Sequence, residues 1–404
     1  MEGSDPRKKI VFLIGSLAGG GAERVFVTLL RHLDRSYFEP HLVLLRAEGE
    51  FVCQVPRDVA VHTLRGGEQR HTPLGLLLLM WSLIQLLWKI RPRTVLSTGR
   101  INLALALVRP LLPRGTKVLI RECSVLSVRL KTESRYPYLW RWLYQCLYRL
   151  ADNVVCHSDF MVKEMTEQLH LPHEQSVRIY NPIDLDLVRE EGRSGGNPYS
   201  GVGPHLVAAG RLSNEKGFDL LLAAMPKVIE CLPDVRLTIL GQGPLKNMLA
   251  EQVQQLGLEE SVSFMGFQQN PWPYLCHADL FVLPSRREGF GNVLLEALAL
   301  ETPAVAVDCP GGVREIYGSN PAVRLVPAGD FVVLAEAIIE RCRAARHEPA
   351  RAKASPDWIN KFALQRIIGE YSALFLGDDD LSFAANKRLM LSGSLICDRV
   401  PQGD

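Results

Sequence analysis

Short apolar runs recur along the chain and alternate with longer segments of helical periodicity. One run covers residues 10–14, and similar runs occur at 206–209, 280–283 and 304–307. Continuous runs of four or five apolar residues are typical of parallel strands that are buried on both faces, and the helices between them complete β-α-β units. The pattern therefore predicts an α/β protein built on parallel sheets.

The strand–helix series is interrupted once, by a segment rich in glycine. Residues 190–204 contain Gly-Gly-Asn-Pro and are interpreted as a linker. A chain of 404 residues is long for one domain and sufficient for two. We predict two Rossmann-like domains, at 1–189 and 205–361.

The segment 279–316 combines this strand–turn–helix pattern with charged and glycine residues in the turns. Glu288 lies in the loop after the strand at 280–283, and Glu296 lies about one turn into the following helix. In a parallel α/β sheet, ligands bind outside the carboxyl ends of the strands. Two carboxylates at this spacing can hold opposite ends of one polyhydroxylated, phosphate-bearing molecule.

The loop between these two carboxylates is suited to an anion. Gly289 and Gly291 let the main chain approach a ligand that a β-carbon would push away. Asn292 is expected to cap the helix, whose free N–H groups then face the anion.

Two cations in the second domain favour a diphosphate ligand. Arg211 follows the strand at 206–209, and Lys216 precedes the next helix. Five residues apart and straddling a turn, they can bracket a diphosphate, the arginine in bidentate fashion and the lysine as a point charge.

Glu288-x7-Glu296, with Gly-Phe-Gly between and Pro310-Gly311-Gly312 after it, resembles the signature of the retaining GT-B glycosyltransferases of family 4. The resemblance spans roughly residues 8–376 and implies two Rossmann-like domains whose parallel sheets face each other across a cleft. It implies that residues 362–376 form a helix crossing back to the first domain. The tail, 377–404, matches no known pattern.

The resemblance also implies roles for individual residues. Glu296 would bind the ribose of a nucleotide-sugar donor and Glu288 would face the transferred sugar, while Arg211 and Lys216 would neutralise the departing diphosphate. Glu288, Arg211 and Lys216 are thus the expected catalytic residues. The further expected donor contacts are Gly20, Gly21, Gly289, Phe290, Gly291 and Asn292, with Gly266 and Phe267 near the nucleobase. No cofactor and no divalent metal would be needed.

The glycine loop 19–21 near the N-terminus has a second interpretation. Its spacing differs from the dinucleotide fingerprint G-x-G-x-x-G, and the strand at 41–45 does not end in an acidic residue, so a dehydrogenase is disfavoured. In the family, the matching loop faces the donor diphosphate. The alternative is a tight strand–helix turn without a ligand.

Cys123 marks a departure from the family pattern. Many members have a His at a strand end here, near the reacting carbon, whereas this chain has Arg-Glu-Cys-Ser at 121–124. Arg121, Glu122 or Ser124 could then substitute. His157, at another strand end, is interpreted as structural.

The distribution of charge along the chain indicates an anionic partner. The net charge is only +2, but residues 51–150 carry 16 Lys and Arg against 4 Asp and Glu. A basic segment in an otherwise neutral protein implies an anionic partner, either membrane headgroups or nucleic acid. No nucleic-acid recognition fold accompanies it, so an anionic membrane surface is favoured.

A helix predicted at 129–150 carries apolar, aromatic and basic bands, as membrane-surface helices do. The residues expected to face the membrane are Arg129, Lys131, Arg135, Trp140, Arg141, Tyr144 and Arg149. An ordinary amphipathic core helix is the alternative. Residues 74–90 form an even more apolar helix, which is either buried or dips into the bilayer surface, and is too short and too often interrupted for a convincing span.

The cysteine spacing, the N-terminal segment and the acidic motifs do not change this interpretation of the chain. Nine Cys occur singly without C-x-x-C, which favours reduced thiols in the cytosol. No apolar signal-type stretch precedes Lys8, so no secretion signal is expected. Acidic segments 184–186 and 378–380 resemble DxD metal motifs but do not lie at a sheet edge, and no metal site is predicted.

The expected function is therefore a retaining, metal-independent glycosyltransferase that moves a sugar from a nucleotide diphosphate, UDP-linked, to a lipid-linked polyprenyl-diphosphate saccharide. The protein would sit peripherally on the cytoplasmic face of a membrane. Two alternatives stay open: a family 4 enzyme with a soluble acceptor, and a catalytically silent membrane-bound partner subunit, which Cys123 keeps in view.

Overall fold

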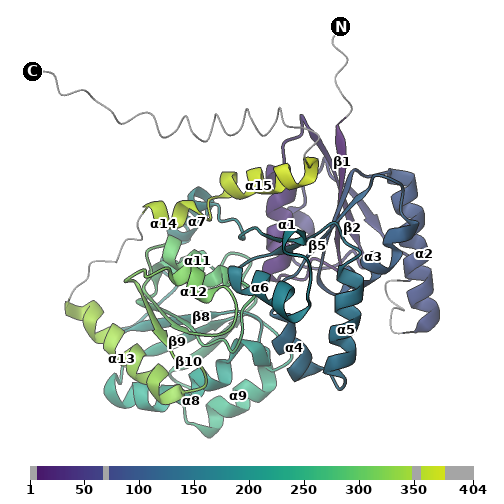
Figure 1. The fold of residues 1–404 in the computed structure, drawn as a ribbon. Helices are drawn as coiled ribbons and strands as arrows, with labels where there is room; N and C mark the ends of the chain where they lie inside the picture. The colour runs from purple at the N-terminus through teal and green to yellow at the C-terminus, as the bar shows by residue number, and fades with distance from the viewer. Residues whose placement is uncertain (1–6, 67–71, 348–355, 378–404) are drawn as a thin grey trace, which may run out of the picture.

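Two α/β domains lie side by side in the structure, a computed structural model that describes residues 7–66, 72–347 and 356–377 (Figure 1). The first sheet has seven strands in the order β3-β2-β1-β4-β5-β6-β7, and the second has six in the order β10-β9-β8-β11-β12-β13. Every strand pair in both sheets is parallel. The predicted GT-B architecture, with two Rossmann-like domains, is confirmed.

The strands of the first domain are buried apolar runs, as the hydrophobic pattern predicts. They are β1 (Lys8–Ile14), β2 (Phe38–Leu44), β3 (Ala60–Thr63), β4 (Thr94–Thr98), β5 (Lys117–Arg121), β6 (Asn153–Cys156) and β7 (Ser176–Arg178). The main helices between them are α1 (Gly21–His32), α2 (Pro73–Ile90), α3 (Asn102–Val108), α4 (Leu126–Glu133), α5 (Pro137–Tyr148) and α6 (Asp159–Lys163), with short helical turns η1 (Val52–Gln54), η2 (Gly99–Ile101), η3 (Arg109–Leu111), η4 (Glu164–Gln168, π-helical) and η5 (His173–Gln175).

The second domain repeats the arrangement. Its strands are β8 (His205–Ala209), β9 (Arg236–Leu240), β10 (Val262–Gly266), β11 (Leu280–Leu283), β12 (Ala304–Val307) and β13 (Val323–Val326). Its helices are α8 (Phe218–Cys231), α9 (Lys246–Gln255), α10 (Trp272–His277), α11 (Asn292–Ala299), α12 (Val313–Tyr317), α13 (Phe331–His347) and α14 (Pro356–Asn360), with the turn η6 (Asn214–Lys216).

Two segments connect the domains. The first contains α7 (Leu185–Ser194), so the helix occupies the first five residues of the range predicted as linker, 190–204. The helix continues until Gly195, after which Gly-Asn-Pro cannot extend it. The second is α15 (Leu364–Leu376), which returns to the first domain, where the Thr94 hydroxyl donates to the Phe375 carbonyl oxygen at 3.1 Å. Apart from Gly377, the tail lies outside the described residues.

The hydrophobic core is continuous across the domain boundary. One cluster joins the face of the first sheet covered by α1 and α15 to the interior of the second domain. Phe12 of β1 packs edge-on against both Phe26 of α1 and Phe375 of α15. A separate cluster lies under α2, α3 and α5 on the other face of the first sheet. The loop after β1 lies against the loop after β10, and the loop after β5 lies against the loop after β11, so the carboxyl ends of strands from both sheets meet at the interdomain boundary.

Candidate active site

Glu288 lies at the carboxyl end of β11 and is nearly buried, at 7% exposure. Its Oε1 is 2.6 Å from Lys216 Nζ and accepts a hydrogen bond from the Ser285 hydroxyl at 2.7 Å. Lys216 ends the turn η6 after β8, so two neighbouring strands supply the pair. The structure thus brings together an acid and a cation that lie 72 residues apart in the sequence.

Two glycines allow the loops around this acid–cation pair to pack closely against neighbouring main chain. Gly217 has a φ of 65°, and a β-carbon there would lie 2.1 Å from the Pro284 carbonyl oxygen, so only glycine lets the Lys216 turn pack on the end of β11. A β-carbon on Gly289 would lie 2.1 Å from the carbonyl oxygen of Cys123. The loop that follows Glu288 therefore packs directly on the first domain, at the segment where the family pattern is broken.

The expected capping role of Asn292 is wrong. Gly291, with a φ of 104°, holds the N-cap position, and Asn292 is the first residue of α11. Its side chain instead reaches across the boundary, where Nδ2 donates to the Gly21 carbonyl oxygen at 3.4 Å and Oδ1 accepts from Asn181 at 2.8 Å. Gly21 and Asn181 both belong to the first domain. The side-chain amide of Asn292 therefore connects the two domains and does not cap the helix.

Arg211 is exposed at the carboxyl end of β8, and its guanidinium makes no hydrogen bond or ion pair with any residue that the structure describes. Its charge reaches Glu23 on α1, next to the glycine loop that contains Gly20. Burial raises the pKa of the Glu23 carboxyl, and the positive charges of Arg121 and Arg211 act against that rise. A guanidinium that makes no hydrogen bond or ion pair with a described residue is available to an anionic ligand at this boundary.

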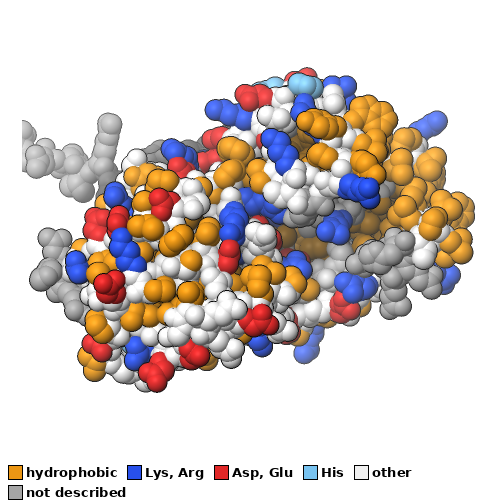
Figure 2. Space-filling view, turned by 90° about the horizontal axis from the view of Figure 1, so that it is seen from below, with side chains coloured by type: hydrophobic (Ala, Val, Ile, Leu, Met, Phe, Trp, Pro, Cys, Tyr) orange, Lys and Arg blue, Asp and Glu red, His pale blue; other side chains and the backbone are white. Residues whose placement is uncertain are grey.

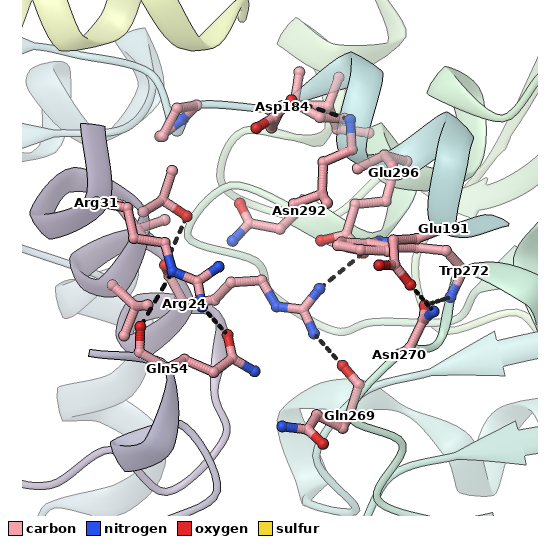
Figure 3. Close-up of a pocket in the computed structure, with 18 residues that line it drawn as sticks. Arg24, Arg31, Gln54, Asp184, Glu191, Gln269, Asn270, Trp272, Asn292 and Glu296 are labelled. Carbon is pink, nitrogen blue, oxygen red and sulfur yellow. Dashed lines mark hydrogen bonds and ion pairs between the residues drawn. The ribbon is translucent and has the colours of Figure 1, made fainter. Parts of the chain in front are cut away.

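Glu296 faces a cavity of about 440 Å³ between the domains (Figure 3). The indole Nε1 of Trp272 donates to Glu296 Oε2 at 2.9 Å, and Arg24 of α1 is 3.7 Å from the same oxygen. Arg24 also donates to the Gln269 carbonyl oxygen at 3.4 Å and lies over the rings of Phe51 and Trp272. A residue of the first domain thus meets the carboxylate that the resemblance assigns to ribose.

The expected site residues fall into two adjacent groups. Glu296 and Asn292 line the cavity, whereas Arg211, Lys216 and Glu288 are not among the residues lining it. The loop 289–291 connects the two groups, since it runs from Glu288 to the start of α11.

The aromatic residues expected near the donor are partly used for packing. Phe290 is 3% exposed and its ring packs against Tyr180 and Phe362, so its side chain is not open to a ligand. Phe267 follows Gly266 at the end of β10, and a β-carbon on Gly19 would touch its ring at 2.7 Å. The glycine loop and the expected nucleobase loop are therefore in contact.

Arg24 and Trp272 were missed by sequence reasoning. Arg24 ends the Gly-Ala-Glu-Arg segment after the glycine loop, which was a usable signal, because the loop itself was recognised. Trp272 follows Pro271 at the start of α10 and carries no comparable signal.

Cys123 is half-buried and His157 is buried, and their surroundings favour the neutral form of both side chains. Cys123 Sγ lies 2.7 Å from the Thr98 hydroxyl and 3.0 Å from the Arg121 guanidinium, and burial raises the pKa of its thiol. Burial lowers the pKa of His157 well below its usual range, and its described contact is with the Ile179 carbonyl oxygen at 3.4 Å. Neither side chain is a charged group in the cleft.

The basic aromatic segment differs from the expected single helix at 129–150, because α4 and α5 are separated at Ser134–Tyr136. Tyr144 is wrongly assigned to the membrane face. It is 7% exposed, and its hydroxyl accepts from Arg129 at 2.8 Å. Arg129 also donates to Ser124 at 3.0 Å, so it points into the domain rather than outward. The sequence pattern alone cannot tell whether the aromatic residues of a helix face the core or the solvent.

The other expected membrane residues stay at the surface to different degrees. Lys131, Arg135, Trp140 and Arg149 are exposed, and Arg141 is half-buried. Helix α2 buries one narrow stripe and exposes Leu74, Leu77, Trp81 and Trp88, so the interpretation as a buried helix is wrong, and contact with a bilayer stays a prediction. Figure 2 shows hydrophobic side chains gathered on the side of the molecule that carries α2. By length and composition alone α2 could cross a membrane, a weak indication because core helices pass the same test.

Grouped metal ligands and disulfides are both absent from the described part of the chain. No group of three or more His, Cys, Asp or Glu side chains there is arranged to hold a metal ion. None of the eight described cysteines forms a disulfide. Of the two DxD-like segments, Asp184 caps α7 by accepting from the Leu187 amide at 3.1 Å, and 378–380 lies outside the described residues.

Two sheets with this strand order, facing loops at one boundary and a Glu-x7-Glu helix define a GT-B glycosyltransferase. Residues 19–187 match the family described as Glycosyltransferase Family 4, and residues 203–343 match the family described as Glycosyl transferases group 1. The chain belongs to this family of GT-B glycosyltransferases.

Individual relatives of this chain are glycosyltransferases as well. A Campylobacter jejuni enzyme named N-acetylgalactosamine-N,N'-diacetylbacillosaminyl-diphospho-undecaprenol 4-alpha-N-acetylgalactosaminyltransferase is 29% identical over 318 residues, which is 78% of this chain and 84% of the relative. The phosphatidyl-myo-inositol mannosyltransferase of Mycobacterium leprae is 32% identical over 180 residues, 44% of this chain and 46% of its own length. The crystal structure of Anabaena HepE with UDP-glucose has a TM-score of 0.74 at 22% identity, covering 91% of this chain and 99% of HepE, and shows the shared fold.

Proposed function

We propose that this protein transfers a sugar from a UDP-linked donor to a saccharide carried on a membrane-borne polyprenyl diphosphate, with retention of anomeric configuration. The observation that carries the proposal is the 2.6 Å contact of Lys216 with Glu288, beside the exposed and unpaired Arg211 at the domain boundary. A departing diphosphate gathers negative charge as the glycosidic bond breaks, so fixed cations at that place act where the transition state is most anionic.

Each part of the boundary then has a role. Arg211, Lys216 and the first turn of α11 stabilise the diphosphate, and Glu288 faces the transferred sugar. Glu296 binds the ribose hydroxyls from the wall of the 440 Å³ cavity. Gly20 and Gly21 face the diphosphate from the first domain, and the nucleobase lies near Gly266 and Phe267. Since two cations serve the leaving group, the reaction needs no divalent metal.

The names of two relatives and the exposed apolar surface of the first domain support a membrane-borne acceptor. The printed name of the Campylobacter relative contains diphospho-undecaprenol, and that of the Mycobacterium relative contains phosphatidyl-myo-inositol. A solved structure with this fold contains UDP-glucose. The exposed apolar side chains of α2 and α5 suit peripheral attachment to a membrane, which we place on the cytoplasmic face.

Replacing Lys216 by Ala tests the assignment. Because the cation acts mainly on the transition state, kcat should fall about 100- to 1,000-fold while donor affinity changes much less. The matched control is Lys246→Ala, an exposed lysine of the same domain, which should keep both constants. Steady-state kinetics with a panel of nucleotide sugars, first ranked by thermal shift, supplies the measurement. Equal losses in kcat and donor affinity would contradict the role given to Lys216.

Two alternatives are separated by simpler measurements. Donor hydrolysis by the purified protein, abolished by Glu288→Ala, would dismiss a catalytically silent partner subunit. Transfer to a water-soluble saccharide at the same rate as to a polyprenyl-linked one would favour the soluble-acceptor enzyme.

A further inference from the structure

A second cavity lies at the opposite edge of the first sheet, where β1, β4 and β5 begin rather than end. Its volume is about 1110 Å³. Seven of the side chains that line it are cationic: Arg7, Lys8, Lys9, Lys89, Arg91, Arg93 and Arg114. No Asp or Glu is among the described residues on its wall. We call this cavity the basic pocket, and nothing in the proposed transfer reaction uses it.

Part of this charge is available to a ligand. Arg93 already donates to the Leu376 carbonyl oxygen at the end of α15, at 3.3 Å. Arg7, Lys89, Arg91 and Arg114 are exposed, and their side chains make no hydrogen bond or ion pair within the part of the chain that the structure describes. Four cations that no neighbouring residue neutralises repel one another, so an anionic ligand would be stabilised among them.

The rim of the basic pocket is apolar. Trp88 is 49% exposed and Leu111 is 59% exposed, and the Trp88 indole donates to the Leu111 carbonyl oxygen at 2.9 Å. Trp88 belongs to α2, whose outer face also exposes Leu77 and Trp81. A cationic pocket that opens onto an apolar, tryptophan-bearing helix face fits a partner that has an anionic head and an apolar body.

We propose that the basic pocket binds the phosphate-bearing headgroups of acidic membrane lipids while α2 lies along the bilayer surface. The 18 residues of α2 span about 27 Å. The helix begins at the edge of the sheet where the strands end and finishes at the basic pocket. Lipid binding at its far end would hold the helix in the plane of the membrane and keep the cleft at a fixed height above it.

A bilayer is favoured over a free phosphate compound because the apolar rim would otherwise stay in water. Trp is enriched where a membrane meets water, and each Lys or Arg near an anionic leaflet contributes about 1 kcal/mol. The inference rests on the proposed membrane-borne acceptor, but it is measured without donor or acceptor, so either idea can fail alone.

The test is flotation of the full-length protein with vesicles of phosphatidylcholine containing 30% phosphatidylglycerol. The variant Arg91→Gln/Arg114→Gln removes two exposed cations of the pocket, and binding should weaken by about tenfold or more. The matched control Lys246→Gln/Arg343→Gln removes two exposed cations from the second domain and should bind like the native chain. Replacing Trp88 by Phe should reduce quenching of tryptophan fluorescence by brominated phosphatidylglycerol.

Three outcomes would overturn the proposal. Equal weakening in the control variant would show attraction by overall charge rather than by this pocket. Unchanged vesicle binding in the pocket variant would remove the lipid assignment. A thermal shift by inorganic pyrophosphate that depends on Arg91 and Arg114, with unchanged vesicle binding, would show that the pocket takes a free phosphate compound instead.

Discussion

Arg24 is the side chain through which the first domain reaches Glu296. It lies 3.7 Å from the carboxylate, contacts the Gln269 main chain and covers the Trp272 ring (Figure 3). Glu296 is itself only 8% exposed, and its carboxylate contacts Arg24 and the Trp272 indole. At the scale of single residues, the predicted ribose-binding group is thus held by a residue of the opposite domain.

Arg24→Ala should therefore weaken donor binding. Hydrogen bonds to charged groups contribute about 1.5–3 kcal/mol, so the KM for the donor should rise about tenfold or more while kcat changes little. The control is Arg31→Ala on the same helix, because Arg31 also lines the cavity but bonds to Gln54. A fall in kcat at constant KM would contradict a positioning role.

At the scale of elements, α4 has no capping side chain of its own, since Val125 holds its N-cap position. Glu164, in the π-helical turn after α6, supplies the cap by accepting from the amides of Leu126 at 2.9 Å and Ser127 at 2.6 Å. Burial raises the pKa of the Glu164 carboxyl, and these hydrogen bonds oppose the rise. The placement of α4 thus depends on a turn far along the chain.

Glu164→Ala should destabilise the fold by about 1–3 kcal/mol, because the buried amide of Leu126 and the half-buried amide of Ser127 lose their acceptor. Urea unfolding at neutral pH measures the change. Glu167→Ala, an exposed position of the same turn, should have almost no effect. Similar losses for both variants would show that the turn, not the cap, carries the stability.

At the scale of the whole molecule, an aromatic cluster fastens the two domains. Phe362, which precedes α15, is fully buried and packs edge-on against Tyr180 of the first domain and Phe290 of the second. The ring centroids lie 5.0 and 5.5 Å from that of Phe362. The loop that follows Glu288 is therefore anchored in the shared core.

Phe362→Ala should cost about 3–5 kcal/mol by leaving a cavity in this cluster. Because the cluster couples the domains, calorimetry should show one unfolding transition becoming two. Phe331→Ala removes the same ring from a position that is 43% exposed, and should leave a single transition near the native temperature. A single lowered transition for Phe362→Ala would mean that other contacts suffice for coupling.

The sequence by itself determined the architecture and the chemical character of the site. Buried strands such as β1 and β11 are visible as apolar runs. Arg211, Lys216 and Glu288 stand in turns that follow such runs, and Glu296 lies inside the helix α11 that comes next. These features are local, because hydrophobic periodicity and turn residues can be recognised within a short window of neighbouring residues.

Only the tertiary structure decided which surfaces meet. Asn292 turns from a cap into an interdomain contact, Arg24 joins Glu296, and Tyr144 turns inward, because each outcome depends on a partner that folding brings near. The exposed face of α2 and the basic pocket at its end were equally undetermined. Hydrophobic residues predict that a helix packs somewhere, but the outward face of a helix is fixed only when its neighbours are in place.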